Sequence, residues 1–455
     1  MINIKSDSRK VKKGDIFVAL NGISSNGEDY VDVAIKNGAS KIIVESDNKY
    51  SVETIKVKDT RAYLNEYLNT HYKSIIDEMN IIGLTGTNGK TTTCYLIYQA
   101  LNSLNIKCAY IGTIGYYLDK KVCSLSNTSP DVCDLFDLIV NAYDNGYKTI
   151  VMEASSQGLA MNRLEGIRFN YAIFTNLTQD HLDYHKTMEN YALAKQLLFK
   201  KLKTDGISIL NADDSYKDYF ITDNTKYYGE LGSDYKIHDI KLGYITSFKL
   251  DIGSNTYNFE SHLIGKYNIY NLVCCIALLN SMNISIDKII NIVKTLSCPP
   301  GRMQIVRYNN SIVVIDYAHT PDAMENIYNT VNEINKGKIY TVFGCTGDRD
   351  RTKRPIMMDL STQNSFYTII TSDDLHNEDF NQIVSDMIKG NTKNNYEIIK
   401  DRAKAIEKGI SLLKDKDILL ILGKGHEEFI IVGNNKIPFN DKEQVEKIIS
   451  KKVIS

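Results

Sequence analysis

A glycine-rich loop followed by a lysine and two threonines offers the clearest chemistry in the sequence. It follows a short apolar run at 81–85 and precedes a segment with a helical pattern at 91–105. Backbone N–H groups of such a loop, together with the positive end of the helix, cradle phosphate oxygens. Lys90 would reach the terminal phosphates, and Thr91 would bind Mg²⁺. The predicted phosphate loop consists of Gly86, Thr87, Asn88, Gly89, Lys90, Thr91 and Thr92.

This loop is a variant of the usual phosphate-binding loop. An ordinary loop of this kind carries a glycine five residues before its second glycine, and here that position is Leu84. A glycine-rich turn that merely starts a helix is the alternative interpretation. The strand pattern before the loop and the Lys-Thr pair after it favour phosphate binding.

Polar residues also stand where two further strands are expected to end. Glu153 lies in the apolar run 149–154, and a dense run of acids and histidines at 180–185 follows the run 172–177. Ligands bind at the carboxyl ends of strands in doubly wound sheets, so these residues should lie near the phosphate loop. A carboxylate and an imidazole beside a triphosphate suit Mg²⁺ or Mn²⁺. Glu153 alone could also be a strand-end cap, whereas packing hardly explains the run 180–185.

The surrounding segments alternate between short apolar runs and helical patterns, which indicates βαβ units and a parallel sheet. We expect an α/β protein of three domains, in agreement with roughly 150 residues per domain. A small N-terminal α/β domain at 1–78 contains short strands and one helix near 31–37. A central P-loop-type domain with a doubly wound parallel sheet follows at 79–298, with an antiparallel patch at 222–264. After a Pro-Pro-Gly chain breaker, a C-terminal Rossmann-like α/β domain occupies 299–455.

Composition excludes several classes of protein. Lys and Arg total 54 and Asp and Glu total 55, so the formal net charge is −1 and nucleic acid is not an expected partner. The first ten residues contain no apolar signal-peptide core, and no run approaches the ~18–20 apolar residues that span a bilayer. The eight cysteines form no CxxC pair, which argues against a zinc site or a disulfide framework. A cytoplasmic protein without membrane insertion is expected.

Seven longer motifs are specific enough to identify a family. They read TGTNGKTT at 85–92, MEASS at 152–156, DHLDYH at 180–185, GRM at 301–303, DYAHTP at 316–321, FGCTGDRD at 343–350 and GKGHE at 423–427. They resemble the motifs of the Mur ligases and, within them, of the MurE-type ligases of UDP-N-acetylmuramoyl-dipeptide. The resemblance extends from Asp7 to about Asp441.

The resemblance implies ATP and Mg²⁺ as cofactors and a catalytic set of Lys90, His181 and Lys195. Thr91, Glu153, His181 and Lys195 would bind the metal, and Lys195 would be carbamylated. Without the resemblance, Lys195 is interpreted as a solvated helix lysine. Beyond the phosphate loop, the implied ATP contacts are Asn268, Asn271, Arg302, Asp316 and His319, although His319 could also be a core histidine.

The resemblance also implies three groups of substrate contacts. Ser8 would lie near the uracil, and residues 23–25 would touch the same nucleotide. The diphosphate, sugar and dipeptide would be held by Thr128, Ser129, Ser155 and Arg163, whose hydroxyl and guanidinium groups suit phosphate oxygens. Positions around the incoming amino acid are Arg349, Asp373, Asp374, His376, Gly423 and Glu427.

The loop for the amino acid departs from the family pattern. Diaminopimelate ligases of this type carry Asp-Asn-Pro-Arg there, and this chain has Asp373-Asp374-Leu375-His376. The arginine that would pair with a distal carboxylate is missing, and histidine is a weak replacement at pH 7. Because Asp373 and Asp374 would face that carboxylate, we expect meso-diaminopimelate to be a poorer substrate than lysine-like or neutral amino acids.

These features together predict an ATP-dependent, ADP-forming amide ligase of peptidoglycan precursor synthesis that acts through an acyl phosphate. Its partners would be UDP-muramoyl-dipeptide and a free amino acid, and a monomer is expected. One alternative is a Mur-ligase paralogue that joins an amino acid to a different carboxylate acceptor outside cell-wall synthesis. A non-catalytic nucleotide-binding scaffold is another alternative, which the complete set of loop and metal residues disfavours.

Overall fold

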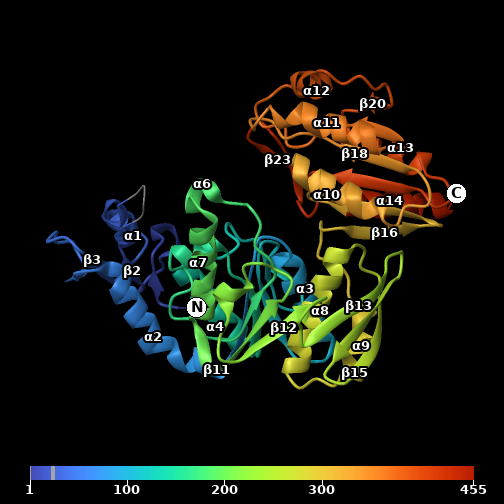
Figure 1. Cartoon of the computed structure of the whole chain (residues 1–455). Helices are drawn as coiled ribbons and strands as arrows, with labels where there is room; N and C mark the ends of the chain where they lie inside the picture. The colour runs from blue at the N-terminus through green and yellow to red at the C-terminus, as the bar shows by residue number, and fades with distance from the viewer. Residues whose placement is uncertain (1, 22–25, 455) are drawn as a thin grey trace. The chain divides into compact units, whose positions relative to one another are not determined.

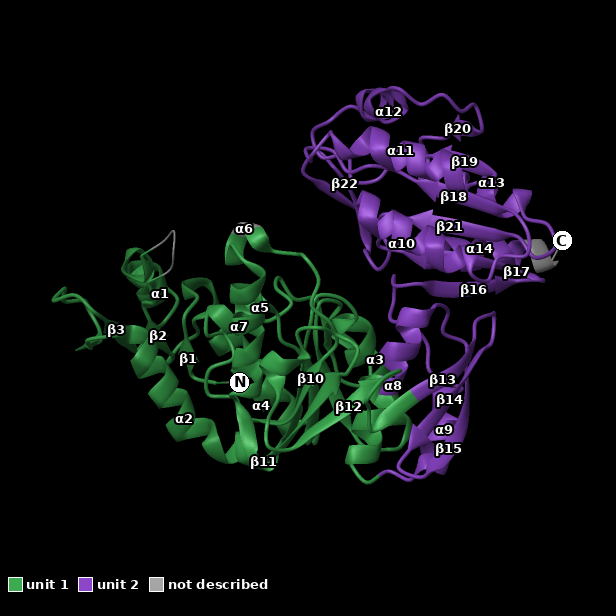
Figure 2. Cartoon of the chain, viewed as in Figure 1, with its two compact units in different colours: residues 1–236, 274–283 green, residues 237–273, 284–455 purple. Residues whose placement is uncertain are grey.

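The computed structural model describes residues 2–21 and 26–454 and contains two compact units (Figure 1, Figure 2). Unit 1 comprises Met1–Lys236 and Cys274–Asn283, and unit 2 comprises Ile237–Val273 and Ile284–Ser455. Helix α8 (Lys266–Ser281) contributes residues to both units. The division into three domains stays a prediction.

The first part of unit 1 is a four-stranded parallel sheet with the order β1-β2-β3-β4. Its strands are β1 (Ile4–Lys5), β2 (Ile16–Val18), β3 (Lys41–Val44) and β4 (Glu53–Lys56). The helical segments are η1 (Ser8–Lys10), η2 (Gly27–Tyr30), α1 (Val31–Lys36) and α2 (Thr60–Glu78).

The prediction of a single helix before residue 78 is wrong, because the 19-residue helix α2 follows. Its few buried apolar residues lie among tyrosines and polar residues, so the apolar periodicity that marks a helix is weak. The usable signal is the helix cap. Asp59 accepts hydrogen bonds from the backbone N–H groups of Arg61 and Ala62 at 2.9 Å each.

The remainder of unit 1 contains the predicted doubly wound sheet, with the order β8-β7-β6-β9-β5-β10-β11-β12. Its strands are β5 (Asn80–Thr85), β6 (Cys108–Gly112), β7 (Gly115–Tyr117), β8 (Lys121–Cys123), β9 (Thr149–Glu153), β10 (Phe169–Phe174), β11 (Leu202–Asn211) and β12 (Thr225–Gly229). Its helices are α3 (Lys90–Ser103), α4 (Val132–Asp144), α5 (Ser156–Ala160), α6 (Leu182–His185), α7 (Met188–Phe199) and η3 (Lys217–Phe220).

Strand β5 lies at the centre of this sheet, between β9 and β10, and all three are parallel. β5 and β9 are almost completely buried, which explains their continuous apolar runs. Parallel strands end at the same edge of a sheet. The segments that follow β9, β5 and β10 therefore meet at one edge, as the sequence predicts.

The expectation of an antiparallel patch at 222–264 is correct only for its second half. Strand β12 is parallel to β11, and the first two residues of β13 (Tyr235–Lys241) pair in parallel with β12. Strands β14 (Thr246–Ile252) and β15 (Asn255–Ser261) form an antiparallel hairpin. Short alternating runs do not distinguish an edge extension of a parallel sheet from a hairpin, because both have one exposed face.

Unit 2 contains the second α/β sheet, with the order β16-β17-β21-β18-β19-β20, in which only β16 is antiparallel to its neighbour. Its strands are β16 (Gln304–Tyr308), β17 (Ser311–Asp316), β18 (Ile339–Phe343), β19 (Tyr367–Ile370), β20 (Tyr396–Ile398) and β21 (Ile418–Leu422). A separate hairpin consists of β22 (Phe429–Val432) and β23 (Asn435–Pro438). The helices are α9 (Ile286–Val293), α10 (Pro321–Asn332), α11 (Lys353–Asn364), α12 (Phe380–Ile388), α13 (Arg402–Leu412) and α14 (Asp441–Ile454).

Two further features bear on the sequence expectations. Among the described residues, no helix combines the length and apolar character needed to cross a membrane. All eight cysteines are free thiols, and most are buried in the cores of the two units.

Candidate active site

The loop after β5 adopts a backbone that only glycine reaches easily at two positions. Gly86 has a φ of 150° and Gly89 a φ of 83°. A Cβ atom on Gly86 would lie 2.0 Å from Oγ1 of Thr175, whose hydroxyl donates to the carbonyl oxygen of Asn88 at 2.6 Å. Gly89 caps α3, which begins at Lys90. The loop therefore packs against the end of β10 and presents a helix N-terminus, as a phosphate site requires. Of the remaining loop residues, Asn88 is exposed and Thr87, Thr91 and Thr92 are half-buried.

Two lysine side chains meet the same carbonyl group of this loop. Lys90 Nζ donates to the carbonyl oxygens of Gly86 and Thr87 at 2.9 and 2.8 Å, and Lys195 Nζ donates to that of Gly86 at 2.7 Å. Lys195 is 1% exposed, so its interpretation as a solvated helix lysine is wrong. Burial, and then the charge of Lys90, lower the pKa of Lys195 well below its ordinary value. The amine is thereby shifted towards its neutral, nucleophilic form.

Glu153 ends β9 as a fully buried carboxylate with four hydrogen-bond donors. Its Oε1 accepts from the hydroxyl of Tyr110 at 2.5 Å and from the backbone N–H of Thr113 at 2.9 Å. Its Oε2 accepts from the hydroxyls of Thr91 at 3.0 Å and Thr113 at 3.1 Å. The four donors are neutral, so they satisfy the carboxylate beside a hydroxyl of the phosphate loop without placing a positive charge next to it. Two hard oxygen atoms in this position fit Mg²⁺ next to a triphosphate.

His181 lies on the exposed side of this region. It is the N-cap of α6 and has a φ of 52°. Its Nε2 is 3.5 Å from Oδ2 of Asp180, and its ring packs edge-on to that of Tyr191. In the described part of the chain it contacts neither Glu153 nor Lys195, so its metal-binding and catalytic roles stay predictions.

The side chains predicted to hold the muramoyl-dipeptide adjoin Glu153. Ser129 Oγ donates to the carbonyl oxygen of Glu153 at 3.0 Å and accepts from the N–H of Ser155 at 3.0 Å. The Oγ1 atom of Thr128 lies 3.1 Å from that of Thr113, which donates to Glu153. The Arg163 guanidinium donates to the carbonyl oxygen of Ser129 at 3.2 Å. The structure thus brings these four residues close to Glu153.

Ser8 lies in the first part of unit 1, within η1, and is buried. Its carbonyl oxygen accepts from the side-chain amide of Asn37 at 2.9 Å. A 2.7 Å ion pair between Lys10 and Asp134 connects this part of the unit to α4. Residues 23–25, expected to touch the nucleotide, lie outside the described residues.

Three of the residues predicted to approach ATP from the later part of the chain lie around the end of β17. Asp316 is 6% exposed and accepts from two backbone N–H groups at 2.7 and 2.8 Å. Desolvation raises the pKa of its carboxyl group, against the opposing charge of Arg302. His319 is half-buried, and its Nδ1 lies 2.8 Å from the carbonyl oxygen of Tyr317. Unit 2 therefore brings Arg302, Asp316 and His319 together.

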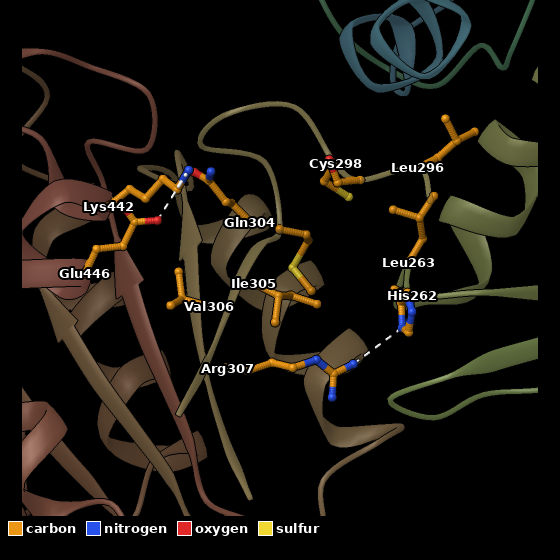
Figure 3. Close-up of a pocket in the computed structure, with 12 residues that line it drawn as sticks. His262, Leu263, Leu296, Cys298, Gln304, Ile305, Val306, Arg307, Lys442 and Glu446 are labelled. Carbon is orange, nitrogen blue, oxygen red and sulfur yellow. Dashed lines mark hydrogen bonds and ion pairs between the residues drawn. The ribbon is translucent and has the colours of Figure 1, made fainter. Parts of the chain in front are cut away.

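The two asparagines predicted to contact ATP, Asn268 and Asn271, are buried in the first half of α8. The amide of Asn271 donates to Oδ1 of Asn268 at 3.1 Å, and Asn268 lies 3.8 Å from Sγ of Cys298. Cys298 also lines a pocket of about 420 Å³ (Figure 3). Figure 3 shows Arg307 beside His262 at one side of it. In the described chain, none of the predicted site residues lines this pocket.

Three carboxylates surround one buried ammonium group elsewhere in unit 2. Lys424 Nζ lies 2.8 Å from Oδ1 of Asp374, 2.7 Å from Oε2 of Glu427 and 3.7 Å from Oδ1 of Asp373. The three acids are close enough to hold a metal ion, but the ammonium already supplies a cation there. Burial raises the pKa of Glu427, against the charge of Lys424. With all four groups ionised, the cluster has a net charge of −2.

This pairing bears on the loop expected to hold the amino acid. Asp373 and Asp374 are predicted to face the distal carboxylate of the substrate, and both lie beside Lys424. Asp374 also accepts from the N–H of Ile431 at 2.8 Å, which connects its loop to the β22–β23 hairpin. His376, with a φ of 48°, forms a β-bridge to the same hairpin. Of the other two residues predicted to lie around the amino acid, Gly423 is buried and Arg349 is exposed.

Sequence reasoning missed Tyr110, Thr113 and Lys424. Tyr110 lies inside the apolar run of β6, where a tyrosine is usually a core residue. Thr113 follows that strand directly, a position typical of ligand-binding loops in such sheets. Lys424 lies within the GKGHE motif, and its position between two glycines after β21 was the available signal.

Three family models match successive parts of the chain. They are described as Mur ligase family, catalytic domain (residues 2–75), Mur ligase middle domain (84–279) and Mur ligase, glutamate ligase domain (301–425). Relatives named UDP-N-acetylmuramoyl-L-alanyl-D-glutamate--2,6-diaminopimelate ligase are similar over nearly the whole length. That of Clostridium tetani is 38% identical over 98% of this chain and 94% of its own, and that of Fusobacterium nucleatum is 40% identical over 99% and 94%.

Solved structures agree with the sequence relatives. A structure with the same ligase name has a TM-score of 0.75 and 31% identity, and covers 99% of this chain and 95% of its own. The MurF ligase of Thermotoga maritima in complex with ADP has a TM-score of 0.66 and 18% identity, over 99% and 98%, and this likeness concerns the fold. Identity near 40% along the whole chain, with the same fold and the same order of parts, shows that this protein belongs to the Mur ligase family.

Proposed function

We propose that this chain catalyses the ATP-dependent addition of an amino acid to UDP-N-acetylmuramoyl-L-alanyl-D-glutamate, with release of ADP and phosphate, in peptidoglycan precursor synthesis. The observation that carries the proposal is the arrangement at one edge of the unit 1 sheet. There the phosphate loop, the buried carboxylate of Glu153 and the hydroxyls of Ser129 and Ser155 lie next to one another. The relatives named above bear this acceptor in their names.

The reaction has two chemical steps. The γ-phosphoryl group of ATP passes to the substrate carboxylate, which forms an acyl phosphate and ADP. The amine of the amino acid then attacks the acyl carbon, the amide forms, and phosphate leaves with the amine losing a proton. Lys90 and the N–H groups at the start of α3 stabilise negative charge on the transferred phosphoryl group. Little covalent chemistry is left for the protein, so positioning is its main contribution.

Glu153 and Thr91 are the residues that would hold Mg²⁺, because their oxygen atoms already lie 3.0 Å apart beside the loop. The ion would neutralise charge on the phosphate oxygens. Lys195 reaches the same loop, and its lowered pKa favours the neutral amine, which is the form that attacks CO₂. Attack of the neutral amine on CO₂ forms an N–C bond, releases one proton and leaves a negatively charged carbamate. A lysine that would repel the metal thereby becomes an oxygen ligand.

The site for the incoming amino acid is proposed at the acid cluster of unit 2. Its net charge of −2, in a buried environment, favours a side chain that ends in an ammonium group. Diaminopimelate, named for the relatives, carries both an ammonium and a carboxylate at its far end. The arginine expected for that carboxylate is replaced by His376. We therefore propose a lysine-like amino acid.

The activity is tested by ADP release from purified protein with ATP, Mg²⁺, UDP-muramoyl-dipeptide and single amino acids. ADP release should require both the acceptor and an amino acid, and the product mass should equal their sum less one water. Release that depends on another carboxylate acceptor, and not on UDP-muramoyl-dipeptide, would support the paralogue alternative, which the altered amino-acid loop favours. Release without any acceptor would contradict the proposal.

A further inference from the structure

Tyr110 contributes a buried hydrogen bond that none of the steps above uses. It lies on β6 with no exposed surface, and its hydroxyl donates to Oε1 of Glu153 at 2.5 Å. Its ring packs edge-on against three other tyrosines, with centroid distances between 5.7 and 6.4 Å. These neighbours are Tyr95, Tyr98 and Tyr117. Because the ring is enclosed on several sides, the position of its hydroxyl is fixed.

The two oxygen atoms of Glu153 have different partners. Oε1 accepts from the hydroxyl of Tyr110 and from the backbone N–H of Thr113. The backbone N–H has no lone pair that could bind a cation. Among the described residues, Oε2 accepts from the hydroxyls of Thr91 and Thr113. A threonine hydroxyl can rotate its hydrogen away and offer a lone pair to a cation. The carboxylate is therefore anchored through Oε1 and leaves Oε2 towards the phosphate loop.

Gly112 provides independent support for this arrangement. A Cβ atom at this position would lie 2.3 Å from Oε1 of Glu153 and 2.5 Å from the hydroxyl oxygen of Tyr110. Both distances are too short for any side chain. The absence of a side chain at Gly112 is therefore what lets the phenol and the carboxylate meet.

We propose that Tyr110 is a positioning residue that holds Oε1 of Glu153, so that Oε2 and the Thr91 hydroxyl face the divalent cation. The inference rests on the metal-binding role proposed for Glu153. Without the phenol hydroxyl, Oε1 keeps a single donor, and the carboxylate can rotate away from the orientation that binds metal. Groups that orient a metal ligand through a hydrogen bond typically change metal affinity by about 10–100-fold when they are removed.

The test compares Tyr110→Phe with Tyr98→Phe, a matched control. Both tyrosines belong to the same ring cluster, but the Tyr98 hydroxyl donates to the carbonyl oxygen of Leu118, at 2.5 Å, instead of to Glu153. Each variant loses one buried hydroxyl and keeps the ring. The proteins are titrated with Mn²⁺ in the presence of adenylyl imidodiphosphate, and the concentration of free Mn²⁺ is measured by electron paramagnetic resonance. The same titration of the nucleotide without protein is the reference.

We expect Mn²⁺ to bind Tyr110→Phe about tenfold more weakly than wild type, and Tyr98→Phe to bind within about twofold. In a Glu153→Gln background, Tyr110→Phe should cause no further loss, because its effect acts through the carboxylate. Wild-type affinity in Tyr110→Phe, or an equal loss in Tyr98→Phe, would overturn the inference. Wild-type protein that binds no Mn²⁺ beyond the nucleotide would overturn it together with the metal role of Glu153. ADP release, measured separately, reports on the ligase function itself.

Discussion

The two candidate sites in this protein have opposite arrangements of charge. In unit 1, the carboxylate of Glu153 is satisfied by neutral donors, and two lysines reach the loop beside it. In unit 2, Lys424 lies among three carboxylates. The first arrangement suits a polyanion that arrives with a divalent cation. The second has an excess of negative charge and suits a ligand that ends in an ammonium group.

This difference shows how the protein keeps charges in buried places. Burying an ion is costly unless it is paired or hydrogen-bonded. Hydroxyl and backbone donors stabilise Glu153 without cancelling its charge, so that charge stays available to a cation. Lys424 neutralises only one of its three neighbours, so a negative excess remains. The sign of the charge that the protein leaves uncompensated indicates the ligand.

The largest expected effect is that of Lys90→Ala on the unit 1 site. If Lys90 faces the terminal phosphates as proposed, its loss should lower ADP release by at least about 10²–10³-fold, a typical effect of removing one transition-state stabilising group. The exposed Lys200, replaced by alanine, is the control and should retain wild-type turnover. Circular dichroism checks the fold. If Lys90→Ala keeps more than about a tenth of the wild-type rate, the phosphate loop has been misassigned.

The second prediction sharpens the role of the other lysine in unit 1. Lys195→Ala should be inactive, and short carboxylic acids such as acetate should restore part of its activity, because they can supply the oxygens of a carbamate. The same acids should not rescue Lys90→Ala, whose missing group is a cation. A high-resolution crystal structure with bound metal whose density for Lys195 ends at a bare ammonium would contradict the prediction.

The amino-acid preference tests the negative excess of unit 2. A distal carboxylate near this cluster, without an arginine partner, should cost at least about 2 kcal/mol, or roughly 30-fold in kcat/KM. Lysine should therefore outcompete meso-diaminopimelate at equal concentration when products are read by mass. A predominantly diaminopimelate product would agree with the names of the relatives. It would mean that another group, such as the exposed Arg349, holds the carboxylate.

The smallest expected effect is a pH dependence of the same cluster. Burial raises the pKa of Glu427, so this carboxylate takes up a proton at a higher pH than an ordinary glutamate. As pH falls through that pKa, the cluster loses negative charge, and kcat/KM for a cationic amino acid should fall up to about tenfold per pH unit. Glu427→Gln should remove this acidic limb of the pH profile. An unchanged limb in the variant would assign it to another group.

The sequence alone predicted those features that depend on residues close together in the chain. The phosphate loop depends on glycines that accept a positive φ and on a lysine beside them, and all of these residues are adjacent in the chain. The alternation of apolar runs and helical segments likewise predicted both α/β sheets. Strong motifs along the whole chain indicated the family, which the relatives confirm. The sequence analysis did not predict the weakly amphipathic helix α2, because most of its surface is polar.

Only the tertiary structure decided which charged groups are buried and which partners they have. Lys195 and Gly86 are separated by 109 positions, Lys424 and Asp374 by 50, and Glu153 and Tyr110 by 43. Each pair meets because separate strands end at the same edge of a sheet or because a helix packs across that edge. Residue type and spacing along the chain determined what chemistry was available in this protein. Packing between distant segments determined which lysine has its pKa lowered by burial, which acids lie beside a lysine and which hydroxyls contact Oε2 of Glu153.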